Sequence, residues 1–292
     1  MGKTEKPPDL LEFTDKYLKE RELIISMLRY EDKILNDEEI GQAIYRNSYN
    51  DSLHSLEPQF IMHRLVLKQF GFTTSDYSVK MYREIFRTYY KSPTEFDAEV
   101  INSVAYMRAN RCIYYTSQKI EVGDKIPNVD LLNLNGSKAN LFTDVLGNPF
   151  EKALLCAFSS SWPPFLKRKD ELILLVKKLE EKSIRFVLIQ IEEAHSDKWK
   201  IGLDYHPPNH ASIEDRLKRA NDFVIDNKIA FPMYVDDWAN TYEQTFQAWP
   251  DKYYLIDKEM VVLKKSIYGK VGDSDGKVML DCLELVKELT SE

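Results

Sequence analysis

The chain has 292 residues, 43% of them hydrophobic, and a formal net charge of -7. This length and apolar content suffice for one large domain or two ordinary ones. The acidic balance argues against a general nucleic-acid-binding protein, which usually carries a basic face. The three cysteines are far apart in the sequence, which excludes a CxxC redox pair and a cysteine zinc cluster.

The sequence also lacks the apolar segments that direct a chain into or across a membrane. No run of about 18 apolar residues is present, so we expect no transmembrane helix. The first ten residues, MGKTEKPPDL, have no apolar run and predict no secretory signal. We therefore expect a cytoplasmic protein that binds neither membranes nor nucleic acid.

Residues 1–118 carry helical patterns throughout. The best-marked helix begins at KSPTEFDAEV, where Ser92 can cap it, Pro93 suits the first turn and Glu95 completes a capping box. Further helices are expected in PQFIMHRLVLKQFGF, which ends near Gly71, and in TTSDYSVKMYREIFRTYY, which Thr74 or Ser75 can cap. The segment from residue 11 to 35 predicts a weaker, charge-rich helix.

The pattern changes near Gly123. Apolar residues alternate around a turn at Asn135-Gly136, which predicts a pair of strands. Strands and helices then alternate, and this order indicates an α/β domain over residues 119–292, behind a helical N-terminal region of residues 1–118. Strands are expected at 153–158, 184–191, 231–235, 253–257 and 261–267, and helices at 164–182, 213–227 and 276–289.

The segment ALLCAFSSSWPPF, residues 153–165, predicts a buried strand, a short polar turn and a helix opened by proline. The amino end of a helix presents unpaired N–H groups and a partial positive charge, which stabilise an anion such as a thiolate. Such a turn therefore suits a reactive nucleophile. Here the position is held by Trp162, and an indole cannot do dithiol redox chemistry.

Four segments resemble the iodothyronine deiodinase family: ALLCAFSSSWPPFLKR, IQIEEAHSDKW, PNHASIEDRLKRA and YVDDWANTYEQTFQAWPDKYYLID. The resemblance extends from about Gly123 to Gly269. Members of that family have a thioredoxin-like fold, with selenocysteine or sometimes cysteine between a polar turn and a proline pair. The resemblance thus implies a thioredoxin-like domain, in which helices flank a central mixed sheet.

The resemblance assigns positions around the turn. Trp162 stands at the selenocysteine position, which is the main departure from the family. Ser160 and Ser161 stand where the family has small polar or thiol residues. Pro163 matches the proline pair, and Phe165 falls where thioredoxins have their resolving cysteine. These residues are expected to surround the substrate.

The resemblance also assigns positions further along the chain. Glu193 and His195 match a Glu-x-His stretch at the family's substrate pocket, where the carboxylate would orient the imidazole. His210 matches a histidine that contacts the phenol end of the substrate, and Arg216 matches a structural arginine. Lys252 stands where the family often has an arginine near the substrate's carboxylate. Lysine keeps that charge but loses the bidentate fork.

Trp249 and Pro250 precede a predicted strand. By analogy with thioredoxin-like proteins, Pro250 is expected to be cis and to face residue 162, and Trp249 is expected to line the same pocket. His206 has no family match and is expected to be incidental, whereas His63 is expected to be structural.

Two interpretations of Trp162 remain open. A selenocysteine codon is UGA, which some translation tables print as tryptophan; the protein would then be a reductive dehalogenase. A selenolate would attack the halogen of an iodinated phenol, histidines would manage the phenol proton, and a thiol reductant would reset the enzyme. No other cofactor and no metal are expected, and dimerisation is one candidate role of the helical region.

If tryptophan is genuine, the alternative is a catalytically silent binding protein with a thioredoxin fold. A third hypothesis is a peroxiredoxin-like thiol or selenol peroxidase. The cysteine nearest to the turn, Cys156, lies inside an apolar strand, where a thiol is inert. The sequence leaves the natural substrate and the reductant open.

Overall fold

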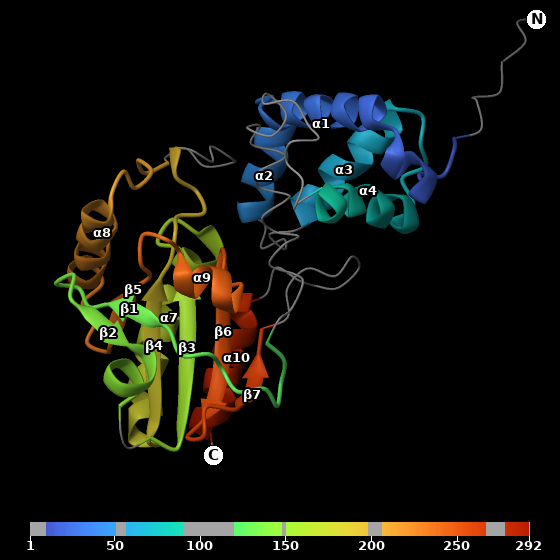
Figure 1. The fold of residues 1–292 in the computed structure, drawn as a ribbon. Helices are drawn as coiled ribbons and strands as arrows, with labels where there is room; N and C mark the ends of the chain where they lie inside the picture. Colours follow the sequence, from blue (N-terminus) through green and yellow to red (C-terminus); the bar gives the residue numbers. More distant parts are fainter. Residues whose placement is uncertain are drawn as a thin grey trace, which may run out of the picture.

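The computed structural model describes residues 10–50, 57–89, 120–147, 150–197, 206–266 and 278–291. Its first part is helical (Figure 1). The charge-rich helix predicted at 11–35 is divided at Glu20 into a 3₁₀ turn and a helix, and a second helix follows that the sequence did not predict. The predicted helix that begins near Ser92 lies outside the described residues. The described helices are η1 (Asp15–Lys19), α1 (Arg21–Leu35), α2 (Gly41–Asn50), α3 (Glu57–Gln69) and α4 (Asp76–Tyr89).

A buried polar group joins three of these helices. The Glu31 carboxylate on α1 accepts a hydrogen bond from the Tyr82 hydroxyl on α4 at 2.6 Å. Nε2 of His63 on α3 lies 3.2 Å from the same carboxylate, and His63 is fully buried. At the start of α4, the Ser75 side chain accepts from the backbone N–H of Ser78, as the predicted cap requires.

The second part contains a seven-stranded mixed sheet in the order β2-β1-β5-β4-β3-β6-β7 (Figure 1). The central strand β3 is parallel to β4 and antiparallel to β6, and β6 is antiparallel to β7. The strands are β1 (Asp130–Leu132), β2 (Lys138–Asn140), β3 (Lys152–Phe158), β4 (Ile184–Gln190), β5 (Met233–Val235), β6 (Asp251–Asp257) and β7 (Val262–Lys265).

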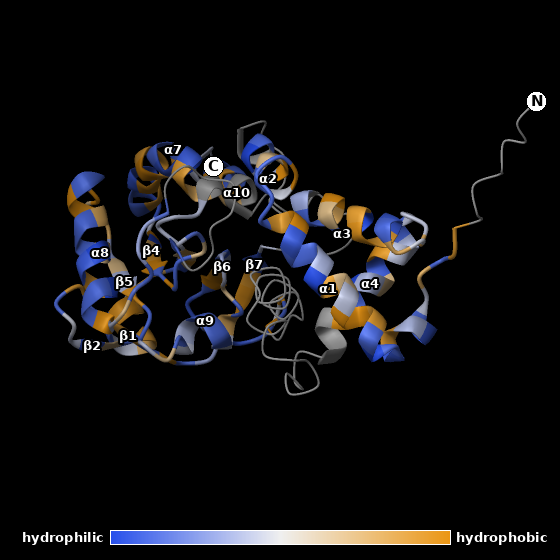
Figure 2. Ribbon diagram, turned by 90° about the horizontal axis from the view of Figure 1, so that it is seen from above, coloured by the Kyte–Doolittle hydropathy of each residue, from blue (hydrophilic) through white to orange (hydrophobic). Residues whose placement is uncertain are grey.

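Helices connect and cover this sheet. A single-turn π-helix, η3 (Leu141–Leu146), precedes β3; α7 (Pro163–Glu181) joins β3 to β4, and α8 (Ile213–Asp226) joins β4 to β5. A short helix, α9 (Thr241–Phe246), leads to β6, and α10 (Val278–Ser291) packs against α7 and β6. Strand β4 is largely hydrophobic, whereas α8 alternates hydrophilic and hydrophobic segments (Figure 2).

The predicted fold class is confirmed. Strand β3, helix α7 and parallel strand β4, followed by the antiparallel pair β6–β7 and helix α10, form a thioredoxin-like arrangement. Helix α9 was not predicted. The carboxylate of Asp236 caps it by accepting from the backbone N–H groups of Tyr242 and Glu243, at 2.8 and 2.9 Å. A helix of six residues is too short to show an apolar periodicity in the sequence, and its cap, Asp236, lies several residues upstream.

The described residues form two hydrophobic clusters. One draws its buried members from residues 13–85 and the other from residues 120–286. The half-buried ring of Phe60 on α3 packs against both clusters. The domain limits 1–118 and 119–292 stay a prediction.

Candidate functional site

The polar turn between β3 and α7 is built as the sequence predicts. Trp162 is the N-cap residue of α7 with an extended backbone (φ -78°, ψ 114°), and Pro163 is the first helical residue. The backbone N–H of Trp162 donates to the Ser159 carbonyl at 3.1 Å, which closes the turn. Residue 162 therefore lies at the positive end of a 19-residue helix.

A fully buried carboxylate, Glu193, fixes the turn from the end of β4. It accepts hydrogen bonds from the hydroxyl of Ser159 at 2.7 Å and from both the backbone N–H and the hydroxyl of Ser161 at 2.8 and 2.6 Å. The hydroxyl of Ser160 and the amide of Gln190 also donate to it. Glu193 thus organises all three serines of the turn.

These hydrogen bonds decide the charge of Glu193. Burial alone would raise its pKa, but the hydrogen bonds from the three serine hydroxyls, together with the interaction with His210, outweigh burial and hold the pKa below its usual value. Glu193 is therefore ionised at neutral pH. Nη1 of Arg219, on α8, lies 3.4 Å from its Oε1 and supplies a counter-charge.

His210, which precedes α8, lies beside this carboxylate. Its Nε2 is 3.8 Å from Oε1 of Glu193, and the side chain is 1% exposed. Burial lowers its pKa to about 4, although Glu193 opposes this shift. The imidazole is neutral at pH 7, and neither ring nitrogen has a hydrogen-bond partner among the described residues.

The side chain of residue 162 meets the second predicted histidine. The indole of Trp162 stacks on the imidazole of His195, with ring centroids 5.2 Å apart and an angle of 23° between the planes. The backbone N–H of His195 donates to the Ser161 hydroxyl at 3.1 Å, which ties this histidine to the turn. His206 also stacks on His195, with the ring centroids 6.3 Å apart.

A carboxyl group lies at the edge of the indole. The indole N–H of Trp162 donates to the side chain of Asp251, the residue that follows Pro250. The Trp249–Pro250 bond is cis, as predicted. Burial raises the pKa of Asp251 to about 7, although the Trp162 hydrogen bond and Lys252 oppose the shift.

Comparisons with known proteins identify the family of the chain. A family model described as iodothyronine deiodinase matches residues 60–274, which is more than half of the chain. The chain belongs to the iodothyronine deiodinase family.

A type I iodothyronine deiodinase from Xenopus laevis is 30% identical to this chain over 154 residues. The match covers 52% of this chain and 57% of the relative, so little more than half of the relative's length is spanned.

Many solved structures are similar to the chain, and two of them serve as examples. A hypothetical protein from Sinorhizobium meliloti 1021 matches 60% of this chain and 87% of its own, with 16% identity and a TM-score of 0.41. Peroxidoxin BcpB from Mycobacterium tuberculosis matches 58% of this chain and 97% of its own, with 15% identity and a TM-score of 0.38.

Other positions that the deiodinase resemblance assigned are buried. Lys252 is 2% exposed, donates to the Gln247 carbonyl at 3.2 Å, and has its pKa lowered to about 7, chiefly by burial. Because neighbouring strand residues point to opposite faces, its ammonium lies across the sheet from Asp251. Phe165 packs on Phe158, with centroids 4.4 Å apart, and Trp249 is 1% exposed.

Arg216 is buried and contacts a loop of the sheet domain. Its guanidinium donates to the carbonyls of Asp236 and Asp237 at 3.3 and 2.7 Å, and it lies over the ring of Trp238. It therefore fixes the loop between β5 and α9, which carries the Asp236 cap of α9.

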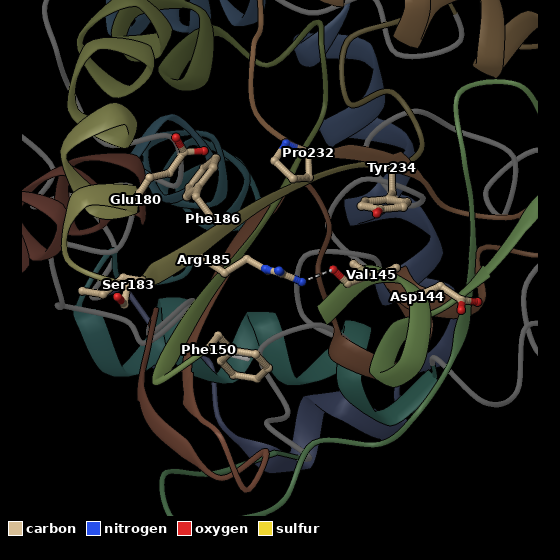
Figure 3. A pocket seen from close by; sticks show the side chains of 10 residues that line it. Asp144, Val145, Phe150, Glu180, Ser183, Arg185, Phe186, Pro232 and Tyr234 are labelled. Atoms are coloured by element: carbon tan, nitrogen blue, oxygen red, sulfur yellow. Dashed lines mark hydrogen bonds between the residues drawn. The ribbon is translucent and has the colours of Figure 1, made fainter. Parts of the chain in front are cut away.

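A pocket of about 400 Å³ lies away from the deiodinase-type turn, where β4 begins (Figure 3). Arg185 crosses it and donates to the Val145 carbonyl at 3.1 Å. Phe150, Pro232 and Tyr234 also line it, and it contains no predicted site residue. We therefore keep the turn as the candidate site.

Four site residues escaped sequence reasoning. Ser159 belongs to the same serine run, and Asp251 directly follows the predicted cis-proline, so both had a signal by position. Gln190 ends β4, and Arg219 lies one turn after Arg216 on α8. Both fall within segments that resemble the family, but nothing in their spacing indicated a contact with Glu193. His206, expected to be incidental, lies against His195, and its Nδ1 is 3.1 Å from the His195 carbonyl.

Two further searches concern the described residues alone. Among the helices that can be placed, none combines the length and the apolar character that a membrane crossing demands. In the same ranges, no three histidine, cysteine or acidic side chains gather as ligands for a metal ion.

Proposed function

We propose that this protein is a reductive dehalogenase that removes iodide from an iodinated phenol, and that its natural residue at 162 is selenocysteine. The observation that supports the proposal is the position of residue 162 in this chain, which belongs to the iodothyronine deiodinase family. It lies at the amino end of α7, against His195, beside the turn that Glu193 organises.

The proposed reaction has two balanced steps. In the first, the selenolate takes the iodine from the ring carbon, the C–I bond breaks, a Se–I bond forms, and a proton replaces iodine on the ring. In the second, two thiols reduce the selenenyl iodide; a disulfide and iodide are released and the selenol is restored. The thiol is a co-substrate, and no other redox cofactor is required.

The side chains supply the conditions for these steps. The positive end of α7 stabilises the selenolate. The imidazole of His210 is neutral and has no hydrogen-bond partner among the described residues, so it can accept the phenol proton or donate to the phenolate. Glu193 acts as a fixed anion that holds the serine turn and keeps Ser161 hydrogen-bonded to the backbone of His195.

The test is iodide release from 3-iodotyrosine or 4-iodophenol with dithiothreitol as reductant. A Trp162→selenocysteine variant is expected to release iodide, Trp162→Cys more slowly, and the Trp162 chain and a Trp162→Ser control not at all. Absence of release from a folded selenocysteine variant, with selenium content confirmed, would contradict the proposal.

One observation favours a second candidate, the silent binding protein. The Trp162 indole is only 2% exposed, stacked on His195 and hydrogen-bonded to Asp251, so tryptophan is well accommodated. A UGG codon at 162 would decide for this candidate.

The thiol form of the peroxidase hypothesis, which would use Cys156, gains no such support. A hydrogen bond with Cys282, followed by burial, raises the pKa of Cys156 well above its usual value, so the thiol stays protonated.

A further inference from the structure

The indole of Trp162 occupies a space whose walls have distinct chemistry. One face lies against the His195 imidazole, with the ring centroids 5.2 Å apart. The pyrrole N–H is directed at the Asp251 carboxyl group. The remaining exposure of the side chain is 2%, so the indole is enclosed almost completely.

The Asp251 side chain has a free acceptor atom for a ligand, as far as the described residues show. It is 2% exposed, and its Oδ1 has no hydrogen-bond partner within the ranges that the structure describes. A buried carboxyl oxygen without a partner is costly, and it gains from any donor that reaches it. Asp251 is also held in place, because it pairs with Phe158 in the register of β6 and β3.

The space would open if residue 162 were small. A selenocysteine or cysteine side chain reaches only the first part of the volume that the indole fills, next to Cα. The remainder is flat, bounded by an imidazole face, and of the size of an aromatic ring. Closed apolar cavities of roughly 150 Å³ in protein cores take up benzene, so a ring-sized cavity is sufficient for binding.

We propose that the volume filled by the Trp162 indole is a subsite for a planar aromatic ring with an O–H or N–H donor, in which His195 stacks on the ring and Asp251 accepts the donated hydrogen. Asp251 is then a specificity-determining residue. That this ring is the iodinated phenol rests on the proposed function. That an aromatic ring binds in the opened space is independent of the proposed function.

The test uses Trp162→Ala, which empties the space, and two bicyclic probes of the same shape. Indole has the N–H donor, and indene lacks it. We expect indole to raise the melting temperature of Trp162→Ala and to bind it in calorimetry at least about tenfold more tightly than indene. The unsubstituted protein, in which the Trp162 indole fills this space, should bind neither probe.

A second change isolates Asp251. In Trp162→Ala/Asp251→Ala, loss of the acceptor should reduce the indole-to-indene affinity ratio to about one, because any change in cavity shape affects both probes alike. Trp162→Ala/Asp257→Ala, altered at the other end of β6, should keep the ratio of the single variant.

Folding of the variants is controlled in the same experiment. If Trp162→Ala is unfolded without ligand, saturating indole should restore its circular dichroism, and Trp162→Cys provides a second, smaller opening. Failure of indole to bind or refold either variant overturns the proposal, as does equal affinity for indole and indene in Trp162→Ala.

The outcomes are separate from those of the proposed function. If the selenocysteine variant releases iodide but Trp162→Ala binds indole no better than indene, only the subsite is contradicted. Binding of indole without iodide release from the selenocysteine variant would support the subsite and contradict the dehalogenase.

Discussion

The carboxylate of Glu193 accepts two hydrogen bonds from Ser161, one from the backbone N–H at 2.8 Å and one from the hydroxyl at 2.6 Å. The same hydroxyl accepts from the backbone N–H of His195. A single buried anion at the end of β4 therefore sets the conformation of the turn that carries residue 162 and also places a predicted histidine.

Replacement of Glu193 should be costly. In Glu193→Gln the amide group must direct its own N–H donors at serine hydroxyls or Arg219, so buried donors lose their acceptor. We expect the free energy of unfolding to fall by about 2–4 kcal/mol in urea denaturation. The neighbouring change Glu192→Gln should cost less than about 1 kcal/mol, and similar losses for both variants would contradict the role given to Glu193.

Acid should destabilise the fold through His210. Its folded-state pKa is lowered to about 4 from an ordinary value of 6.5. Between pH 6.5 and 4 the unfolded chain therefore binds a proton that the folded chain does not. Stability consequently decreases as the pH is lowered. The wild type should lose roughly 2–3 kcal/mol more than His210→Gln between pH 7 and 4. Parallel stability curves for the two proteins would be inconsistent with a buried neutral imidazole.

Asp251 should have the opposite pH dependence. Its folded-state pKa is raised to about 7 from 3.8, so its stabilising contribution is complete below pH 3.8 and is lost as pH rises through 7. Asp251→Asn removes the buried charge that develops at high pH. Its stability relative to wild type should thus increase by roughly 2–3 kcal/mol between pH 5 and 8.5. Asp257→Asn is the control, and an unchanged Asp251→Asn difference would refute the assignment.

The helical region provides a test that is independent of residue 162. Tyr82→Phe removes the 2.6 Å hydrogen bond to buried Glu31, and we expect a loss of about 1–3 kcal/mol. Tyr77→Phe, on the same helix but with a ring that is 49% exposed, should change stability by less than about 0.5 kcal/mol. Thermal unfolding followed by circular dichroism measures both.

The sheet domain could be predicted closely because its strands carry continuous apolar runs and its helices begin at clear caps. Strand β3 was predicted at 153–158 and lies at Lys152–Phe158; α8 was predicted at 213–227 and lies at Ile213–Asp226. In both cases local sequence determines the limits, because hydrophobic periodicity and the Ser212 cap coincide with them.

The contacts within the site could not be predicted in the same way. Arg219 meets Glu193 only because α8 packs against β5, and Asp251 meets the indole only because β6 lies beside β3. Such pairings follow from tertiary packing between residues more than 25 positions apart. The family resemblance named Glu193, His195 and His210, but it did not indicate that Glu193 binds all three serines of the turn.

The proposed selenocysteine stands or falls with the identity of residue 162 in the protein from its source organism. Mass spectrometry of the peptide that spans the turn, isolated from native protein, measures it. Our account predicts the mass and isotope pattern of one selenium atom, encoded by UGA. A peptide with the mass of tryptophan, encoded by UGG, would contradict it.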